Sequence, residues 1–504
     1  MRRMIALFIV VAMVSFSVVG CGITDGPSFD EGATKQTTTT TVINSIYSET
    51  SATLNGSSEH ADTTSITAKV ETTTSETMSS LTTSMTESIT PPTVTPVSRL
   101  PEVKYSENDN NTYYTDILNL PNGGYAVAGV KHTYDYLLSM IRIYDNNSQF
   151  VNEYLFGDGN GYDKIATCTD GGYIAASYNP PYLTKISSDF RVEWVKEYYD
   201  VACEGIVQDV AQIGVEYAVL FAGTPYPTTN LKIAFLDEKG KLTKTIDLMK
   251  NTDISDGDII PDGYDGFYLV LTCNENLANK FDLVKNEYNN MRATEVVIMH
   301  FNSDKQLTFA KTIGGGGNDW IEESTIDNDG NIYLAVGTDW YGADSFWNMS
   351  VERSFPYRRM LVKLDKKGNI VYRAPLANKG MAVDQVFGIH INDNKAYVVG
   401  MADYFDGYQV KYPCEQISPS EKGERVFCVY NACFDSNGKE LDRKIFRCDI
   451  NNTPCDSAIL SNGSLVIAGG VSADENPFNL KFPSSTSRLA AIFIFNADKL
   501  ANLY

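Results

Sequence analysis

A short apolar strand that follows a tight polar turn recurs along the chain from about residue 100 onward. Its clearest copies are residues 122–129, 170–176 and 329–337, where Asn or Asp with glycine precedes small and β-branched residues. Gly, Asn and Asp favour turns, whereas short apolar runs between turns favour buried strands. Weaker copies centre on Tyr217, Tyr268, Tyr397 and Leu465, so the pattern predicts seven copies of one β unit.

Each unit contains further strands around this one. A second apolar strand ends in a polar turn, as at 141–147, 297–305 and 361–368, and a strand that is often charged follows, as suits an outer edge. A loop then leads to the first strand of the next unit. Four antiparallel strands per repeat are typical of a β-propeller blade.

The two ends of the repeated region predict a closed ring. The last unit stops after its third strand, 489–495, and residues 101–105 resemble the fourth strands at 151–156 and 309–313. We therefore expect residues 101–105 to pair with the last unit and complete it. The fold class is then all-β, a seven-bladed propeller; six or eight blades stay open, because the weaker copies are easily miscounted.

The first residues of the chain have the three parts of a secretory signal. A positive start that includes Arg3 is followed by an apolar run to Val19 and by Gly20, and the run is short for a membrane span. The ending V-V-G-C resembles a bacterial lipoprotein signal. The resemblance implies that residues 1–20 are removed, that Cys21 carries lipid such as palmitate, and that the rest is exported. A simple secretory signal or an uncleaved helix is the alternative.

Residues 33–97 are mostly Thr and Ser. Such a segment cannot bury enough apolar surface to offset its ordering entropy. We expect residues 21–97 to form a lipidated N-terminus and a disordered stalk, of a composition that is often O-glycosylated, and residues 98–504 to form the propeller. This organisation predicts a protein of the cell envelope, lipid-anchored and exposed on the outer face of the membrane.

Residues 312–320, 329–337 and 362–369 carry three glycine- and aspartate-containing motifs in order along one repeat. They resemble the repeat of the bacterial secreted β-propeller repeat proteins, which runs G-G-x-G-x-D, then D-G-G-Y with an apolar A-G ending, then K-L-D-x-x-G. The match is good in three units and weaker in the others. The resemblance implies the fold and an extracellular setting. It implies no reaction, because propellers host many functions.

Composition excludes several kinds of partner and cofactor. A net charge of −22 argues against nucleic acid and anionic lipid surfaces, so we expect membrane contact through the lipid anchor alone. The four histidines are scattered and no C-x-x-C pair occurs, which argues against zinc. Residues 327–331 lack the glycine position and the closing glutamate of a calcium loop and are predicted to form a hairpin turn. We expect no metal, no cofactor and a monomer.

The cysteines do not define a disulfide framework. Cys168, Cys203 and Cys273 lie in apolar, strand-like contexts and are expected to be buried thiols. A local bridge between Cys448 and Cys455 stays open.

Long connections mark one predicted face of the disc. They lie at 273–293, 338–358, 401–424 and 471–487, each after the second strand of its unit, so all four must emerge on the same side. Long loops on a rigid scaffold usually carry function. Their aromatic rings suit sugars or peptide side chains, and they suit packing of the loops onto the disc equally well. The candidate ligand-binding residues on this face are Trp320, Trp340, Tyr341, Trp347, Tyr404 and Tyr408.

Acidic residues on or before innermost strands offer a second kind of chemistry. They are Asp319, Glu322, Glu323 and Asp384, and a carboxylate pair can cleave glycosides at the right spacing. Hydrogen bonding within the disc is the alternative. Nucleophile and phosphate-binding motifs are missing, so we favour a module that binds an extracellular glycan or protein without catalysis. A polysaccharide-active enzyme and an envelope assembly scaffold are the other hypotheses.

Overall fold

The computed structural model describes residues 102–495 with internal gaps. The gaps are residues 106–111, 133–136, 158–160, 178–179, 203–205, 223–229, 251–253, 275–293, 315–317, 339–357, 377–381, 405–425, 448–455 and 473–487. Within the described ranges the strands form seven antiparallel sheets of four strands each. The prediction of a seven-bladed propeller is therefore confirmed, and rings of six or eight blades are excluded.

The first six blades are each built from four consecutive strands. Blade 1 contains β2 (Thr112–Asn119), β3 (Tyr125–His132), β4 (Leu137–Tyr144) and β5 (Phe150–Phe156). Blade 2 contains β6 (Lys164–Thr167), β7 (Tyr173–Ala176), β8 (Tyr182–Ile186) and β9 (Val192–Glu197), and the short helix α2 (Tyr199–Ala202) follows. Blade 3 contains β10 (Ile206–Ile213), β11 (Glu216–Ala222), β12 (Asn230–Leu236) and β13 (Leu242–Lys250).

The second half of the ring repeats this order. Blade 4 contains β14 (Ile254–Pro261), β15 (Phe267–Asn274), β16 (Thr294–Phe301) and β17 (Leu307–Ile313). Blade 5 contains β18 (Asp319–Ile326), β19 (Ile332–Thr338), β20 (Arg358–Leu364) and β21 (Ile370–Pro375). Blade 6 contains β22 (Ala382–Asn392), β23 (Lys395–Tyr404), β24 (Val426–Phe434) and β25 (Glu440–Arg447).

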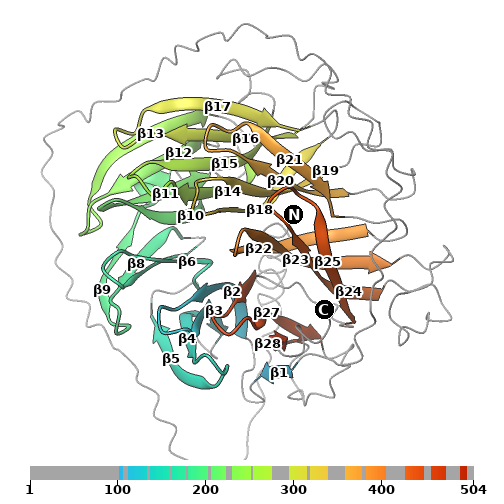
Figure 1. The fold of residues 1–504 in the computed structure, drawn as a ribbon. Coiled ribbons are helices and arrows are strands. Elements are labelled where there is room, and N and C mark those ends of the chain that lie inside the picture. Colours follow the sequence, from blue (N-terminus) through green and yellow to red (C-terminus); the bar gives the residue numbers. More distant parts are fainter. Residues whose placement is uncertain are drawn as a thin grey trace, which may run out of the picture.

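Blade 7 joins the two ends of the described chain. Its first three strands are β26 (Asp456–Ile459), β27 (Leu465–Ser472) and β28 (Arg488–Phe495), and its outer strand is β1 (Glu102–Tyr105). β1 pairs antiparallel with β28, from Glu102 opposite Ile494 to Tyr105 opposite Ala491 (Figure 1).

The first strand of every blade lies at the centre of the ring. Neighbouring first strands contact one another all the way round, including β26 with β2, while β5, β9, β13 and β17 lie towards the rim (Figure 1). The first strands carry irregularities in register, as between Tyr114 and Asp116 and between Val207 and Asp209. Such bulges twist the strands locally, which suits the crowded centre of a propeller.

The hydrophobic core lies between the blades. Second and third strands are buried on both sides; Leu220 of blade 3, for example, shares one apolar cluster with Leu269 of blade 4, and Val336 of blade 5 shares another with Ile298 of blade 4. Their continuous apolar runs follow from this burial on two faces. Outer strands have one exposed side, which explains their charged and mixed composition.

Aspartate-centred turns join strands on one edge of the blades. In the hairpin between β18 and β19, Asp327 Oδ1 accepts the backbone N–H groups of Asp329 and Asn331 at 3.0 and 2.8 Å, and Gly330 has a φ of +83°. A positive φ favours glycine, which explains the recurrent D-x-x-G pattern. The prediction of a hairpin turn at this position is confirmed.

Two of the predicted buried thiols are confirmed. Cys168 and Cys273 are free and buried, and Cys433 is buried as well, whereas Cys203, Cys448 and Cys455 lie outside the described residues. The third strand of each blade is the one that the sequence analysis describes as the second apolar strand. It begins a few residues earlier than predicted, because its leading residues already pair with the second strand of the blade. A search of the described helices for one with the length and apolarity needed to cross a membrane finds no candidate.

Candidate functional site

The two faces of the disc differ in how the strands are connected. In an antiparallel blade, the connections from second to third strand and from one blade to the next emerge on the same face. The longest connections, 275–293, 339–357, 405–425 and 473–487, all join second to third strands. We call this side the long-connection face. The opposite side, which holds the short turns, is the tight-turn face.

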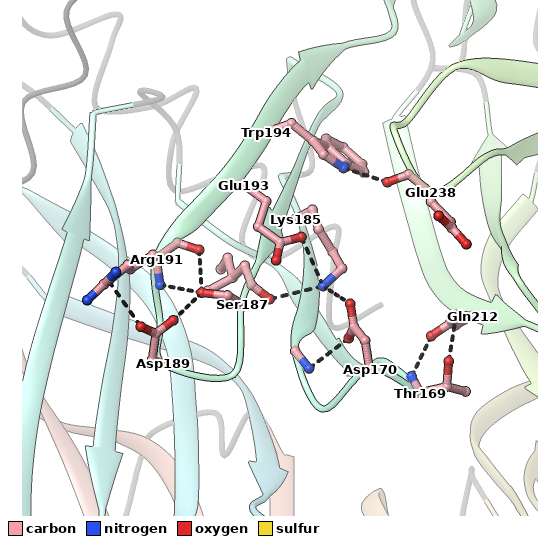
Figure 2. Close-up of polar contacts among 12 residues, drawn as sticks. Thr169, Asp170, Lys185, Ser187, Asp189, Arg191, Glu193, Trp194, Gln212 and Glu238 are labelled. Atoms are coloured by element: carbon pink, nitrogen blue, oxygen red, sulfur yellow. Dashed lines mark hydrogen bonds and ion pairs between the residues drawn. The ribbon is translucent and has the colours of Figure 1, made fainter.

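Polar groups on the tight-turn face hold neighbouring blades together. Trp194 of β9 donates its indole N–H to the carbonyl of Glu238 in blade 3 at 2.9 Å, and Gln212 of β10 accepts the Thr169 N–H at 2.6 Å (Figure 2). The Tyr198 hydroxyl likewise donates to the Gly240 carbonyl at 2.6 Å. These side chains have structural roles at the seam between blades 2 and 3.

A buried ion pair lies beneath the same turns. Lys185 of β8 is almost fully buried, and its ammonium group lies 2.8 Å from Asp170 and 3.5 Å from Glu193 (Figure 2). Burial opposes ionisation of Asp170, but hydrogen bonds from Lys185 and from the Gly172 N–H outweigh it and lower the pKa of Asp170. The charge of Lys185 is thus compensated within blade 2.

Trp320, a predicted ligand-binding residue, is held by its own blade. Its ring lies over Gly337 of β19, where a Cβ would approach to 2.2 Å, and the Arg359 guanidinium lies 5.1 Å from the ring centroid. The indole N–H donates to Glu322 Oε1 at 2.9 Å. The Trp320 side chain is partly buried.

Glu322 links blade 5 to blade 6. Arg359 donates to Glu322 Oε1 from Nε and Nη2 at 3.0 and 2.6 Å, and the Val386 N–H donates to Oε2 at 2.8 Å. Both side chains of this ion pair are only 7% exposed. A carboxylate with these donors is fixed in position and ionised, which describes a structural junction.

Asp319 faces a second buried carboxylate. Its side chain and that of Glu295 both point at Gly314, with oxygens 2.5 and 2.4 Å from the position of a hypothetical Cβ. Both residues are buried, Asp319 completely. The nearby Glu295 charge adds to burial in raising the pKa of the Cys273 thiol. Glu295 is the second residue of β16 and Asp319 the first residue of β18, and Gly314 directly follows β17.

Further ionisable residues form a belt around the centre of the ring. Asp116, Lys164, Asp258, Glu323 and Asp456 each stand three residues before the last residue of a first strand, and Asp209 stands four residues before the end of β10. The sequence analysis missed all of these except Glu323. Their common position ahead of the first turn of each unit was the available signal.

The carboxylates of this belt accept hydrogen bonds from the next blade. Asp456 accepts the Ile117 N–H at 3.2 Å, Asp116 accepts the Ile165 N–H at 2.8 Å, and Asp209 of β10 accepts the Ile259 N–H at 2.7 Å. Asp258 in turn accepts the Ser324 hydroxyl at 2.6 Å. The belt therefore pairs backbone groups that the bulged first strands leave without ladder partners.

Burial and crowding shift the titration of this belt. Burial raises the pKa of Asp209 to about 7; Asp258 adds to the shift, whereas Lys164 and the Ile259 N–H oppose it. His390 of β22 is buried, which lowers its pKa to about 4, and its Nε2 lies 2.9 Å from the Ser457 hydroxyl. No group of three or more His, Cys, Asp or Glu in the described ranges is arranged to hold a metal ion.

The predicted site residues are only partly brought together. Trp320, Asp319 and Glu322 lie on β18, Asp384 lies on β22, and Tyr404 ends β23. Trp340, Tyr341, Trp347 and Tyr408 fall in connections outside the described residues, as does Cys21.

Comparison with known proteins finds matches among solved structures alone. No protein-family model and no curated protein matches the chain. Among solved structures, virginiamycin B lyase from Staphylococcus aureus has a TM-score of 0.45 at 10% identity, covering 78% of this chain and 99% of that one. Drosophila Plexin A in complex with Semaphorin 1b has a TM-score of 0.43 at 9% identity, with 80% and 88% covered. BBS1N in complex with ARL6DN has a TM-score of 0.41 at 9% identity, with 82% and 100% covered.

Proposed function

We propose that this seven-bladed propeller is a surface-anchored binding module that engages an extracellular glycan or protein through its long-connection face. The observation that carries the proposal is the difference between the two faces. The tight-turn face uses its polar groups within and between blades, whereas the four longest connections all emerge on the other side. Variable loops on a rigid scaffold are the usual place for recognition.

The composition of those connections favours a ligand with flat apolar surfaces. The connection 339–357 contains Trp340, Tyr341 and Trp347. The connection 405–425 contains Tyr408, and Tyr404 directly precedes it. Asp and Asn residues lie among these aromatic residues. Aromatic faces beside polar groups suit sugar rings and peptide side chains. The partly buried Trp320 ring borders the same face.

The described acids favour binding over catalysis. Both carboxylate oxygens of Glu322 accept hydrogen bonds, and the belt carboxylates accept hydrogen bonds from backbone N–H groups of neighbouring blades. Asp319 is fully buried against Glu295. A general acid must reach its substrate, so these carboxylates are better placed to hold the ring than to cleave a glycoside.

Anchoring rests on the first residues of the chain. The apolar run before Cys21 and the Thr/Ser-rich segment 33–97 support a lipidated cysteine on a long spacer. In this arrangement the disc stands clear of the cell envelope. The proposal is tested by replacing Cys21 with Ala, which should abolish incorporation of labelled palmitate and release the protein from the membrane fraction.

Binding is tested with residues 98–504 on an array of glycans and extracellular proteins. The double variant Trp340→Ala, Trp347→Ala should lose binding to whatever ligand the array reveals. Tyr264→Ala is the matched control, because Tyr264 is an aromatic residue of the tight-turn face that is 86% exposed. If both variants bind the ligand equally well, the binding site does not depend on Trp340 and Trp347, which would contradict a site on the long-connection face. Product release from a bound polysaccharide, abolished by Asp319→Asn, would favour the enzyme instead.

A further inference from the structure

A threonine, a histidine and an aspartate of blade 4 form one hydrogen-bonded chain at the tight-turn edge. The Thr308 hydroxyl lies 2.6 Å from Nδ1 of His300, and Nε2 of the same ring lies 3.0 Å from Asp262 Oδ2. A hydroxyl, an imidazole and a carboxylate bonded in this order are the parts of an activated nucleophile, which is recognised by its geometry and not by sequence position.

Asp262 is held by the turn between β14 and β15. Its Oδ1 accepts the backbone N–H groups of Tyr264 and Gly266 at 2.6 and 3.0 Å, while Oδ2 faces His300. A Cβ on Gly266 would lie 2.4 Å from Asp262 Oδ2, so glycine provides the room that this side chain needs. The turn therefore fixes the carboxylate towards the imidazole.

The His300 ring is held in one orientation and one tautomer. Tyr268 of β15 and Phe309 of β17 stand opposite His300 on the two neighbouring strands, with ring centroids 4.6 and 5.6 Å from that of His300. A carboxylate is an acceptor only, so Nε2 carries the hydrogen that is directed at Asp262. In the neutral ring Nδ1 then accepts the hydrogen of the Thr308 hydroxyl, as a general base must.

Thr308 is the extra residue of a bulge in β17. Phe309 stands opposite His300 and Leu307 opposite Phe301, so Thr308 has no opposite residue. Bulges re-aim side chains and are frequent beside active sites. The Thr308 hydroxyl also lies 3.1 Å from the His300 carbonyl oxygen, the longer of its two contacts. Thr308 is exposed, whereas the side chain of His300 is only 18% exposed, so the hydroxyl is accessible and its base is shielded.

Blade 3 has the same bulge without the imidazole. Thr243 is the extra residue at the equivalent shift of register, it is exposed, and Phe235 stands at the place of His300. The Thr243 hydroxyl donates to Glu216 Oε1 at 2.7 Å and to the Phe235 carbonyl at 3.0 Å. Burial opposes ionisation of Glu216, but the hydrogen bond from Lys305 outweighs it and lowers the pKa of Glu216, which makes this carboxylate a weak base. Thr243 is therefore a matched hydroxyl without activation.

We propose that Thr308 is a nucleophile that accepts an acyl group from activated esters, with His300 as the general base and Asp262 as the positioning residue. As Thr308 Oγ1 bonds to the ester carbonyl carbon, its proton passes to His300 Nδ1, and the Asp262 carboxylate stabilises the imidazolium. The bond from the carbonyl carbon to the leaving alcohol oxygen then breaks, and that oxygen takes the proton from Nδ1. The products are acyl-Thr308 and the free alcohol. This site lies on the tight-turn face and does not depend on ligand binding by the long-connection face.

The first test compares two hydroxyls within one folded chain. The full-length protein is treated with p-nitrophenyl acetate, and acetylated residues are located by peptide mass spectrometry over time. We expect Thr308 to be acetylated roughly 100-fold faster than Thr243, because general-base assistance is worth about 100- to 10,000-fold in rate. Equal acetylation of Thr308 and Thr243, or acetylation of neither, would overturn the proposal.

Two variants assign the roles of the partners. His300→Phe gives blade 4 the arrangement of blade 3 and should reduce the acetylation rate of Thr308 to that of Thr243. Asp262→Asn keeps an oxygen for the turn N–H groups, but its amide donates to His300 Nε2 and moves the ring hydrogen to Nδ1. Acetylation should then fall by about 100-fold or more.

The tautomer of His300 separates positioning from a purely structural role of Asp262. Nitrogen-15 NMR of the imidazole should show the hydrogen on Nε2 in the wild type and on Nδ1 in Asp262→Asn. Undiminished acetylation of Thr308 in a folded His300→Phe variant would show that the imidazole is not the base. Where a variant does not fold, the comparison of Thr308 with Thr243 in the wild type decides.

Discussion

The indole ring of Trp194 in blade 2 covers Gly240 in blade 3, with ring carbons 2.9 and 3.0 Å from the position that a Cβ would take. Phe309 covers Gly368 and Tyr372 covers Gly438 in the same manner at later seams. The glycine of the D-x-x-G turn therefore serves two needs, a positive φ and room for an aromatic ring of the preceding blade.

Gly240→Ala should test the need for room. We expect the free energy of unfolding to fall by about 1 kcal/mol for a side chain at positive φ and by a further 1 to 3 kcal/mol, roughly, for the clash with Trp194. Gly263→Ala is the control, since its φ is +81° but no heavy atom lies within 4 Å of the new Cβ. Urea unfolding measures both. Equal losses would show that the ring simply moves aside.

Ser148→Gly should stabilise the protein. Ser148 has a φ of +57° at the turn position where Gly240 and Gly368 stand in other blades. Because glycine adopts a positive φ without strain, the free energy of unfolding should rise by about 0.5 to 1 kcal/mol, as measured by thermal or urea unfolding. Lys305→Gly relieves a φ of +59° but removes an ion pair to Glu216 at 2.8 Å, so we expect no comparable gain from it.

The Lys185 ion pair predicts an asymmetry between its partners. Asp170→Asn leaves a buried ammonium with one acid at 3.5 Å and should cost about 3 kcal/mol. Lys185→Met should cost less, because Asp170 and Glu193 are 53% and 45% exposed and can be solvated. The reverse order in urea unfolding would contradict this account.

Acidification should weaken the same ion pair. Because the pKa of Asp170 is lowered in the folded protein, its stabilising effect is present above the unfolded pKa and is lost as the pH falls through the folded one. The stability difference between the wild type and Asp170→Asn should therefore shrink on acidification. Circular dichroism melts at a series of acidic pH values would measure it.

Glu322→Gln distinguishes a structural from a catalytic acid. The change leaves the buried Arg359 guanidinium without its counterion and should cost about 3 kcal/mol of stability. Trp320→Phe removes the indole N–H donor to Glu322 and shortens the ring but leaves the charge of Glu322 paired with Arg359, so it should cost less, about 1 to 2 kcal/mol. Loss of an enzymatic activity with unchanged unfolding in Glu322→Gln would argue for catalysis.

The sequence predicts the architecture well because each repeat is defined by turn residues and apolar runs that are close together in the sequence. Turn residues such as Asp327 and Gly330, with the apolar run after them, define each hairpin without knowledge of its neighbours. The belt was missed for the opposite reason. Asp116 bonds to a residue of the next blade and Asp456 to blade 1, so their roles depend on the curvature of the ring, which no local pattern expresses.

Trp320 illustrates the same limit at the candidate site. Trp320 is the second residue of β18 and not part of the connection before that strand. Its contacts with Gly337, Arg359 and Glu322 come from three different strands and depend on blade packing. Local patterns separate surface loops from strands. They do not distinguish an aromatic side chain that packs within the protein from one that is available to bind a ligand.

The pairing of β1 with β28 has a consequence in time. During synthesis β1 emerges before any other strand of the ring, yet its partner is the last strand that the structure describes. Blades 1 to 6 can each form from neighbouring residues, whereas blade 7 must wait while β1 stays unpaired. Contacts between such distant segments form slowly. We therefore expect an open, six-bladed intermediate to precede the closed ring, with an exposed β28 edge as its point of vulnerability.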